Sequence, residues 1–194
     1  MTYYIDFDNT LFDTVSFYND LKLIMNDYGI DEKIIKKYHI DNKGIYSPLK
    51  LIDYCIEKKI ANNNIISEVM KHFDNAKKYL YNDAEDFLMR IKSNENKLVL
   101  LTYGDFDYQQ KKIKPCLIEK YFDEIIITDK EKYSLDLDFK NGVFVDDNCK
   151  VIKGILTRNP YKVIRVKRIN NPRSKHVLNN NIVFEHEDLK GIGI

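Results

Sequence analysis

Short apolar runs, each bounded by polar or turn residues, mark the strands that the sequence predicts. Buried strands of a parallel sheet read as nearly continuous apolar runs, because both of their faces are covered. Six such runs occur along the chain, and the last of them is the weakest. They are Thr2–Phe7, Lys97–Thr102, Glu124–Thr128, Gly142–Val145, Lys162–Val166 and Ile182–Phe184.

Between residues 102 and 162 the predicted strands alternate with segments of helical length. These segments are Asp105–Lys120, Lys130–Phe139 and Asn148–Leu156. Strand–helix–strand alternation is typical of a parallel sheet with helices on both faces. We therefore predict an α/β fold, with a doubly wound, Rossmann-like parallel sheet of about five or six strands.

Residues 14–94 differ from the rest because they contain no strand-like run and show apolar residues at helical spacing. Ser47 followed by Pro48 predicts the start of one helix, since Ser caps helices and Pro is favoured at the first helical position. Asp83 is expected to cap a last helix. We predict an all-helical insertion over residues 14–94, with the α/β core formed by residues 1–13 and 95–194.

Composition limits the kinds of partner. Lys and Arg number 31 and Asp and Glu number 30, so the formal charge of +1 gives no electrostatic case for nucleic acid or a membrane surface. No apolar run approaches the ~18–20 residues of a membrane span, and the N-terminus lacks the pattern of a secretory signal. Three widely spaced cysteines are interpreted as buried thiols. We expect a cytoplasmic protein with a small partner and, by default, a monomer.

Acidic and hydroxyl side chains follow three of the predicted strands. Asp6 and Asp8 follow the first strand, Asp146 and Asp147 follow the fourth, and Thr102 ends the second. The carboxyl ends of parallel strands share one edge of the sheet, where ligands bind in open α/β folds. Carboxylates gathered there need protons or a cation to offset their repulsion. Mg²⁺, a hard cation with oxygen ligands, suits such a site.

The order Asp-x-Asp-x-Thr, a strand ending in Thr, a lysine, and a strand ending in Asp-Asp resembles the haloacid dehalogenase-like hydrolases. The helical insertion resembles that family's C1-type cap, so the resemblance covers nearly the whole chain. It implies a Mg²⁺-dependent phosphatase for a small phosphorylated metabolite, with Asp6 as the nucleophile that forms an aspartyl-phosphate and Asp8 as acid and then base. Thr102 would hold a phosphoryl oxygen. Asp147 would bind Mg²⁺ with Asp6 and the backbone carbonyl of Asp8, assisted by Asp146.

Two positions depart from the family's pattern. The family's lysine often precedes a proline, and no Lys-Pro pair occurs between residues 128 and 146. Lys130 and Lys132 are both candidates, and Lys132 is preferred because it lies deeper in the predicted helix. Many relatives have an aspartate four residues after the metal-binding one, but Val151 stands there after Asp147. How Asp146 and Asp147 share the metal is therefore open.

Further candidates lie beside the acidic residues. Thr10, Tyr103 and Gly104 are the expected substrate-binding residues, and Asp105 is a candidate for the rim of the site. The basic segment 165–176 is interpreted as a solvated loop, with a substrate-binding patch as the alternative. A carbon–halogen hydrolase would not need Asp8 as an acid, so phosphoryl chemistry is favoured. A phosphomutase of the same superfamily and a catalytically silent ligand-binding module are the alternatives.

Overall fold

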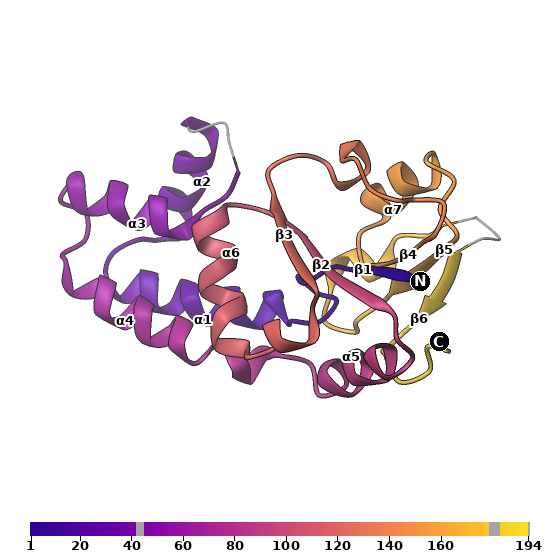
Figure 1. Ribbon diagram of the computed structural model, residues 1–194. Helices are drawn as coiled ribbons and strands as arrows, with labels where there is room; N and C mark the ends of the chain where they lie inside the picture. The colour runs from indigo at the N-terminus through magenta and orange to yellow at the C-terminus, as the bar shows by residue number, and fades with distance from the viewer. Residues whose placement is uncertain (42–44, 179–182, 194) are drawn as a thin grey trace.

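Six parallel strands form one sheet in the computed structural model, which describes residues 1–41, 45–178 and 183–193 (Figure 1). The strand order β3-β2-β1-β4-β5-β6 starts at β1 and winds outward in both directions, which confirms the doubly wound α/β fold. Residue 182, predicted to open the last strand, lies outside the described residues. The strands are β1 (Thr2–Ile5), β2 (Lys97–Tyr103), β3 (Glu124–Thr128), β4 (Gly142–Asp146), β5 (Lys162–Val166) and β6 (Val183–His186).

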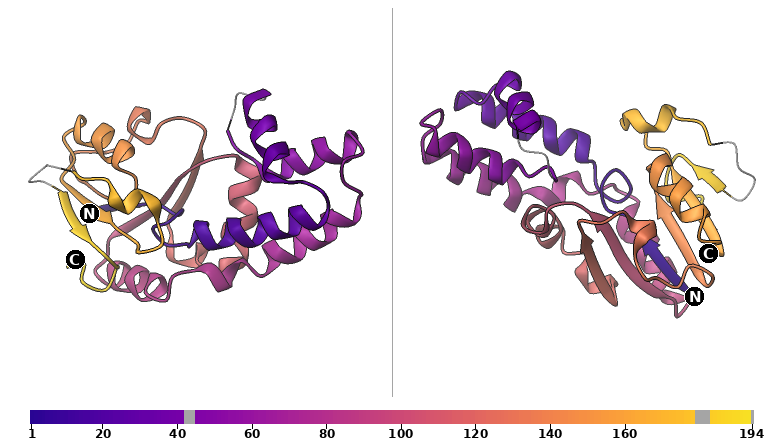
Figure 2. Two further views of the ribbon diagram at one scale, coloured as in Figure 1. Left: turned by 180° about the vertical axis from the view of Figure 1, so that it is seen from behind. Right: turned by 90° about the horizontal axis from the view of Figure 1, so that it is seen from above.

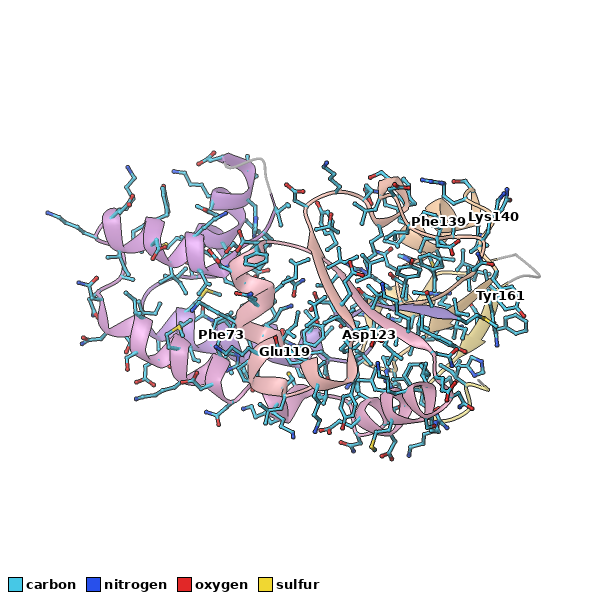
Figure 3. The ribbon with its side chains drawn as sticks, viewed as in Figure 1. Phe73, Glu119, Asp123, Phe139, Lys140 and Tyr161 are labelled. Atoms are coloured by element: carbon cyan, nitrogen blue, oxygen red, sulfur yellow. The ribbon has the colours of Figure 1, made fainter. Side chains whose placement is uncertain are left out.

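Side chains alternate between two apolar cores, one on each face of the sheet. Ile5 of β1 joins the core that includes α5 (Ala84–Ser93), whereas Tyr4 joins the core that includes α7 (Cys149–Leu156). Figure 1 shows α7 and α5 on opposite sides of the sheet. Figure 3 labels one phenylalanine of each core, Phe73 among the helices and Phe139 close to α7. Both faces of the sheet are thereby covered, as its nearly continuous apolar strands require.

The helices between β1 and β2 take up two positions. Figures 1 and 2 show α1–α4 beyond the carboxyl ends of the strands, whereas α5 runs along the sheet and contacts β2. The division of the chain at residues 14 and 94 stays a prediction. Within the described ranges, no helix is both long and apolar enough to cross a membrane. The helices before α5 are α1 (Thr14–Asp27), α2 (Glu32–Asp41), α3 (Pro48–Glu57) and α4 (Asn64–Asp74).

The helix predicted over Lys130–Phe139 is wrong. This segment contains only a short 3₁₀ turn, Lys132–Ser134, followed by irregular chain. Leu135, Leu137 and Phe139 all pack against the core on the α7 side. A spacing of two residues between buried side chains suits an extended chain and not a helix. The helix predicted over Asn148–Leu156 is present as α7, which follows its cap Asn148. The segment Asp105–Lys120 contains α6 (Phe106–Ile113), which is followed by two 3₁₀ turns.

The interpretation of segment 165–176 as a solvated loop is wrong for Arg165 and Arg168, which are buried, and holds only for exposed positions such as Lys175. Arg168 donates to both oxygens of Asp83, at 2.7 and 2.8 Å, and to the carbonyl oxygen of Thr10. Asp83 does precede α5, as predicted, but its side chain accepts from Arg168 and does not cap the helix. Arg168 therefore ties the chain after β5 to the turn after β1 and to α5.

We expect Arg168→Met to lower the free energy of unfolding by about 3–5 kcal/mol, because it leaves the buried Asp83 carboxylate without its cation. Urea denaturation of the purified variant measures this change. Lys175→Met, on the exposed side of the same segment, is the control and should change stability by no more than about 0.5 kcal/mol. A loss below about 1 kcal/mol in Arg168→Met, the range of exposed ion pairs, would contradict the expectation.

Candidate active site

A tight turn directly after β1 places Asp6 and Asp8. The Asp6 N–H donates to the carbonyl oxygen of Val145, which extends the sheet by one residue beyond β1. The Phe7 carbonyl oxygen then accepts the N–H groups of residues 10, 11 and 12, so the chain reverses at once. Asn9 has φ = 59°, a left-handed conformation that Asn tolerates better than most residues. The turn directs both aspartates into one cavity.

Three buried carboxylates meet at this edge of the sheet. One oxygen from each of Asp6, Asp146 and Asp147 lies within 4.8 Å of the other two. The ammonium of Lys132, also buried, donates to Asp6 at 2.5 Å and to Asp146 at 2.7 Å. The half-exposed Arg173 lies 3.7 Å from Asp147 and adds a weaker, solvent-screened attraction. These two cations do not neutralise three buried carboxylates, so the cluster keeps a need for additional positive charge or for protons.

The pKa values of Asp6 and Asp147 are raised, which is the consequence of this shortage of positive charge. Burial raises the pKa of Asp6 well above its usual value, and the neighbouring Asp146 and Asp147 add to the effect against the attraction of Lys132. Burial and the charge of Asp146 raise the pKa of Asp147 to about 7. A divalent cation would relieve the same repulsion without protons. Clustered carboxylate oxygens are the ligands that Mg²⁺ prefers, so these residues fit that ion.

Neighbouring donors orient each carboxylate of the cluster. Thr10 donates to Asp6 at 3.0 Å, the Asn148 N–H donates to Asp146 at 2.8 Å, and Asn171 donates to Asp147 at 2.6 Å. Asn171 reaches the site from the segment after β5, which Arg168 holds in place. Among the described residues, no donor takes the second oxygen, Oδ1, of Asp147, so this atom is free to bind a cation.

Asp8 belongs to a second, separate cluster. Its Oδ1 accepts from the Thr14 hydroxyl and from the Lys112 ammonium, each at 2.5 Å, and its Oδ2 accepts from Gln109 at 2.6 Å. Burial by itself raises the pKa of Asp8, but the charge of Lys112 and these three hydrogen bonds outweigh burial and hold the pKa below its usual value. The structure therefore favours an ionised Asp8.

The two clusters share a cavity of about 660 Å³ between the sheet and the helices beyond its carboxyl edge. Asp6, Asp8, Asp146, Asp147 and Lys132 line its charged part, and Arg173 and Lys150 also reach it. Another part of the lining is mostly aromatic and apolar. It is formed by Val15, Tyr18, His39, Ile45, Tyr46 and Tyr108.

Of the remaining predicted site residues, two line the cavity and three do not. Tyr103 and Gly104 line the cavity, but Thr10 contacts Asp6 and is not part of the wall. Thr102 is fully buried, and its hydroxyl oxygen has no hydrogen-bond partner among the described residues. Lys130 does not line the cavity. Its side chain is exposed, and its hydrogen bonds to the Thr128 hydroxyl come from its backbone N–H and carbonyl oxygen.

Sequence reasoning missed several residues around the cavity, above all Gln109 and Lys112. Asn171 and Arg173 lie in the basic segment 165–176, for which a substrate-binding patch was the alternative that was not preferred. A signal in the sequence existed for Lys112. It lies four residues after Tyr108 and next to Ile113, on the buried face of α6, where an unpaired lysine is rarely found. The others come from segments whose approach to the site depends on the tertiary fold.

The Rossmann-like fold and the acidic edge are those of a hydrolase of the haloacid dehalogenase type. A family model described as haloacid dehalogenase-like hydrolase matches residues 4–134, about two thirds of the chain. The chain belongs to this family of enzymes, which confirms the resemblance to the family, while the C1-type cap stays a prediction. No curated protein matches the sequence.

Solved structures of the same family share the fold. A haloacid dehalogenase-like hydrolase of Burkholderia xenovorans superposes with a TM-score of 0.76 at 17% identity, over 97% of this chain and 92% of that one. The Bacillus subtilis HAD-hydrolase YfnB, bound to magnesium, gives 0.59 at 14% identity, over 97% and 94%. The L-2-haloacid dehalogenase of Xanthobacter autotrophicus gives 0.57 at 17% identity, over 88% and 78%. At these identities the likeness shows the fold alone.

With EDTA present, we expect the melting temperature to fall as the pH rises from about 5.5 to about 8. The pKa of Asp147 is about 7 in the folded protein and near 3.8 in the unfolded chain. The folded state therefore holds the extra proton below pH 7 and loses this stabilisation as the pH rises through 7. Scanning calorimetry across the pH range measures the effect.

Mg²⁺ provides the control for this prediction. It should raise the melting temperature more at pH 8 than at pH 5.5, because it competes with the proton for the same carboxylates. Asp147→Asn, which keeps the shape but cannot ionise, should show a weaker dependence on both pH and Mg²⁺. A metal-free protein whose stability increases over this pH range would contradict the assignment.

Proposed function

We propose that the protein is a Mg²⁺-dependent phosphatase that hydrolyses a small phosphorylated metabolite through an aspartyl-phosphate on Asp6. The observation that carries this proposal is the placement of Asp6 and Asp8 on one turn, in one cavity, with Lys132 beside Asp6. A carboxylate can accept a phosphoryl group and thereby divide hydrolysis into two easier displacements. Family membership supports a hydrolase, and these residues support the phosphoryl reaction.

Asp8 is ionised in the free site and must first take a proton, which a substrate that binds as its phosphate monoanion would supply. In the first displacement an Asp6 oxygen attacks phosphorus, the bond from phosphorus to the leaving oxygen breaks, and Asp8 passes this proton to that oxygen. In the second, Asp8 takes a proton from water, the water oxygen attacks phosphorus, and the Asp6 carboxylate is released. Lys132 and the Thr102 hydroxyl would hold phosphoryl oxygens during both steps. Bound Mg²⁺ would supply further positive charge for the oxygens of the transition state.

The presence of Asp8 favours phosphate esters over carbon–halogen substrates. An alkoxide leaving group needs a proton, whereas a halide leaves as a stable anion. Asp8 is the second carboxylate in reach of such a leaving group, and it lines the cavity with Asp6. The dehalogenase activity of one structural neighbour is therefore not proposed for this chain.

The cavity supports a small substrate. Its volume of about 660 Å³ lies within the range of ligand pockets, roughly 300–1,000 Å³. Most of the aromatic and apolar lining comes from α1, α2 and the chain before α3, which we assign as a cap that closes over the substrate and excludes water. A roofed site of this kind suits a metabolite and not a folded phosphoprotein.

The three cysteines are buried free thiols, which agrees with the cytoplasmic compartment that we expect.

Asp6→Asn should reduce Mg²⁺-dependent phosphate release from p-nitrophenyl phosphate by on the order of a thousandfold or more, because the amide is a far weaker nucleophile. Phosphate release is measured for both proteins with Mg²⁺ and with EDTA, and then on a panel of phosphorylated metabolites. The exposed Asp136→Asn is the matched control and should retain full activity. Turnover that persists in Asp6→Asn would exclude Asp6 as the nucleophile. Isomerised sugar phosphate without free phosphate would favour a mutase.

A further inference from the structure

Lys112 occupies an unusual position for a lysine. It lies on α6 with 1% of its surface exposed, and its ammonium is 4.5 Å from the ring centroid of Tyr108, 5.5 Å from that of Phe7 and 5.7 Å from that of Phe12. Aromatic rings attract a cation but do not replace the hydrogen bonds that water gives it. Among the described residues, the one carboxylate within ion-pair distance of the ammonium is Asp8, at 2.5 Å. The fold thus buries a charge whose partner is the acid/base candidate.

Gln109, one turn earlier on the same helix, reaches the same carboxylate from a fixed direction. Its amide nitrogen donates to Asp8 at 2.6 Å and to the carbonyl oxygen of Tyr103 at 2.9 Å. The carbonyl can only accept, so the nitrogen must face both oxygens and the amide has one orientation. A Cβ at Gly104 would lie 2.7 Å from this nitrogen, so glycine leaves the space that Gln109 occupies.

Rotation of the Asp8 carboxylate is thereby opposed from two directions. Gln109 and Lys112 come from α6, which follows β2, while Thr14 is the first residue of α1. Each of the two carboxylate oxygens is held by at least one donor, so neither can turn without breaking a short hydrogen bond. Proton transfer requires the carboxylate within hydrogen-bond reach of the reacting oxygen, and small misplacements reduce the rate strongly.

We propose that Lys112 is a positioning residue for proton transfer: with Gln109 it holds the Asp8 carboxylate at the site where the leaving oxygen departs. This role rests on the proposed phosphatase reaction. It predicts that the loss of Lys112 matters most when the leaving group needs a proton. An alkyl phosphate releases a strongly basic alkoxide, whereas p-nitrophenyl phosphate releases a stable anion and depends little on an acid.

The test is kcat/KM of Lys112→Met on a series of phosphomonoesters, from p-nitrophenyl phosphate through phenyl phosphate to glycerol phosphate. Methionine fills the ring-lined space without the charge. The loss should grow along the series, to between about tenfold and a hundredfold for glycerol phosphate. This is less than the roughly hundredfold to ten-thousandfold that acid–base catalysis contributes, because Gln109 and Thr14 still hold Asp8. For p-nitrophenyl phosphate it should stay below about threefold. Lys112→Arg should recover part of the loss on glycerol phosphate.

A double-mutant cycle separates positioning from a general effect on the fold. If Lys112 acts through Asp8, then adding Lys112→Met to Asp8→Asn should cost no further activity on glycerol phosphate. Lys114→Met, exposed where α6 ends, should match the wild type on every ester. Thermal unfolding of each variant shows whether it is folded at the assay temperature.

Two results would overturn the positioning role while the phosphatase itself stands. One is a Lys112→Met protein as active as the wild type on all esters. The other is an equal loss on all esters that persists in the Asp8→Asn background, which would indicate a structural role alone. A folded wild type that releases phosphate from none of the esters would overturn the phosphatase reaction and this role together. The wild-type rates therefore distinguish the two failures.

Discussion

The repulsion among four carboxylates at one edge of the sheet is the constraint on which the rest of the site depends. Three of them form one buried group and the fourth, Asp8, lies on the same turn as Asp6. Two buried lysines divide the task of stabilising them: Lys132 is shared by Asp6 and Asp146, and Lys112 pairs with Asp8. Uncompensated charges cost far more in the protein interior than paired ones, so each lysine must reach its partner.

The two lysines reach the acids through local structures that residue preferences alone would not predict. Lys132 reaches the acids from a short 3₁₀ turn, and the chain after it runs extended, with alternate side chains packed on the core. Lys112 reaches Asp8 only because α6 turns a charged residue toward aromatic rings. Departures of this kind from local preference are expected where function sets the requirement.

The sequence therefore predicted the strands and the acidic edge well, and the surroundings of the acids poorly. Buried strands are recognised by their apolar runs. Asp146 directly follows such a run, so the strand order alone places it at the carboxyl edge of the sheet. Lys112 and Asn171 lie in segments distant along the chain, and only tertiary packing brings them to their aspartates. Lys132 was preferred over Lys130 for an incorrect reason, since the helix assumed there does not exist. The buried Arg168 could not be told from a solvated residue without its partner Asp83.

The arginines in and after β5 hold the site in place, but most of the negative charge of the aspartates remains. Arg165 is fully buried and binds Glu185 and two backbone carbonyl oxygens of this segment, and Arg168 pairs with Asp83. Arg165 and Arg168 are thus compensated by acids outside the metal-binding group. Arg173 forms only a longer ion pair with Asp147, at 3.7 Å, and its side chain is half exposed. At hydrogen-bonding distance, the Asp147 side chain receives the neutral amide of Asn171. The amide orients the carboxylate but leaves its charge in place, and that charge is what attracts a divalent cation.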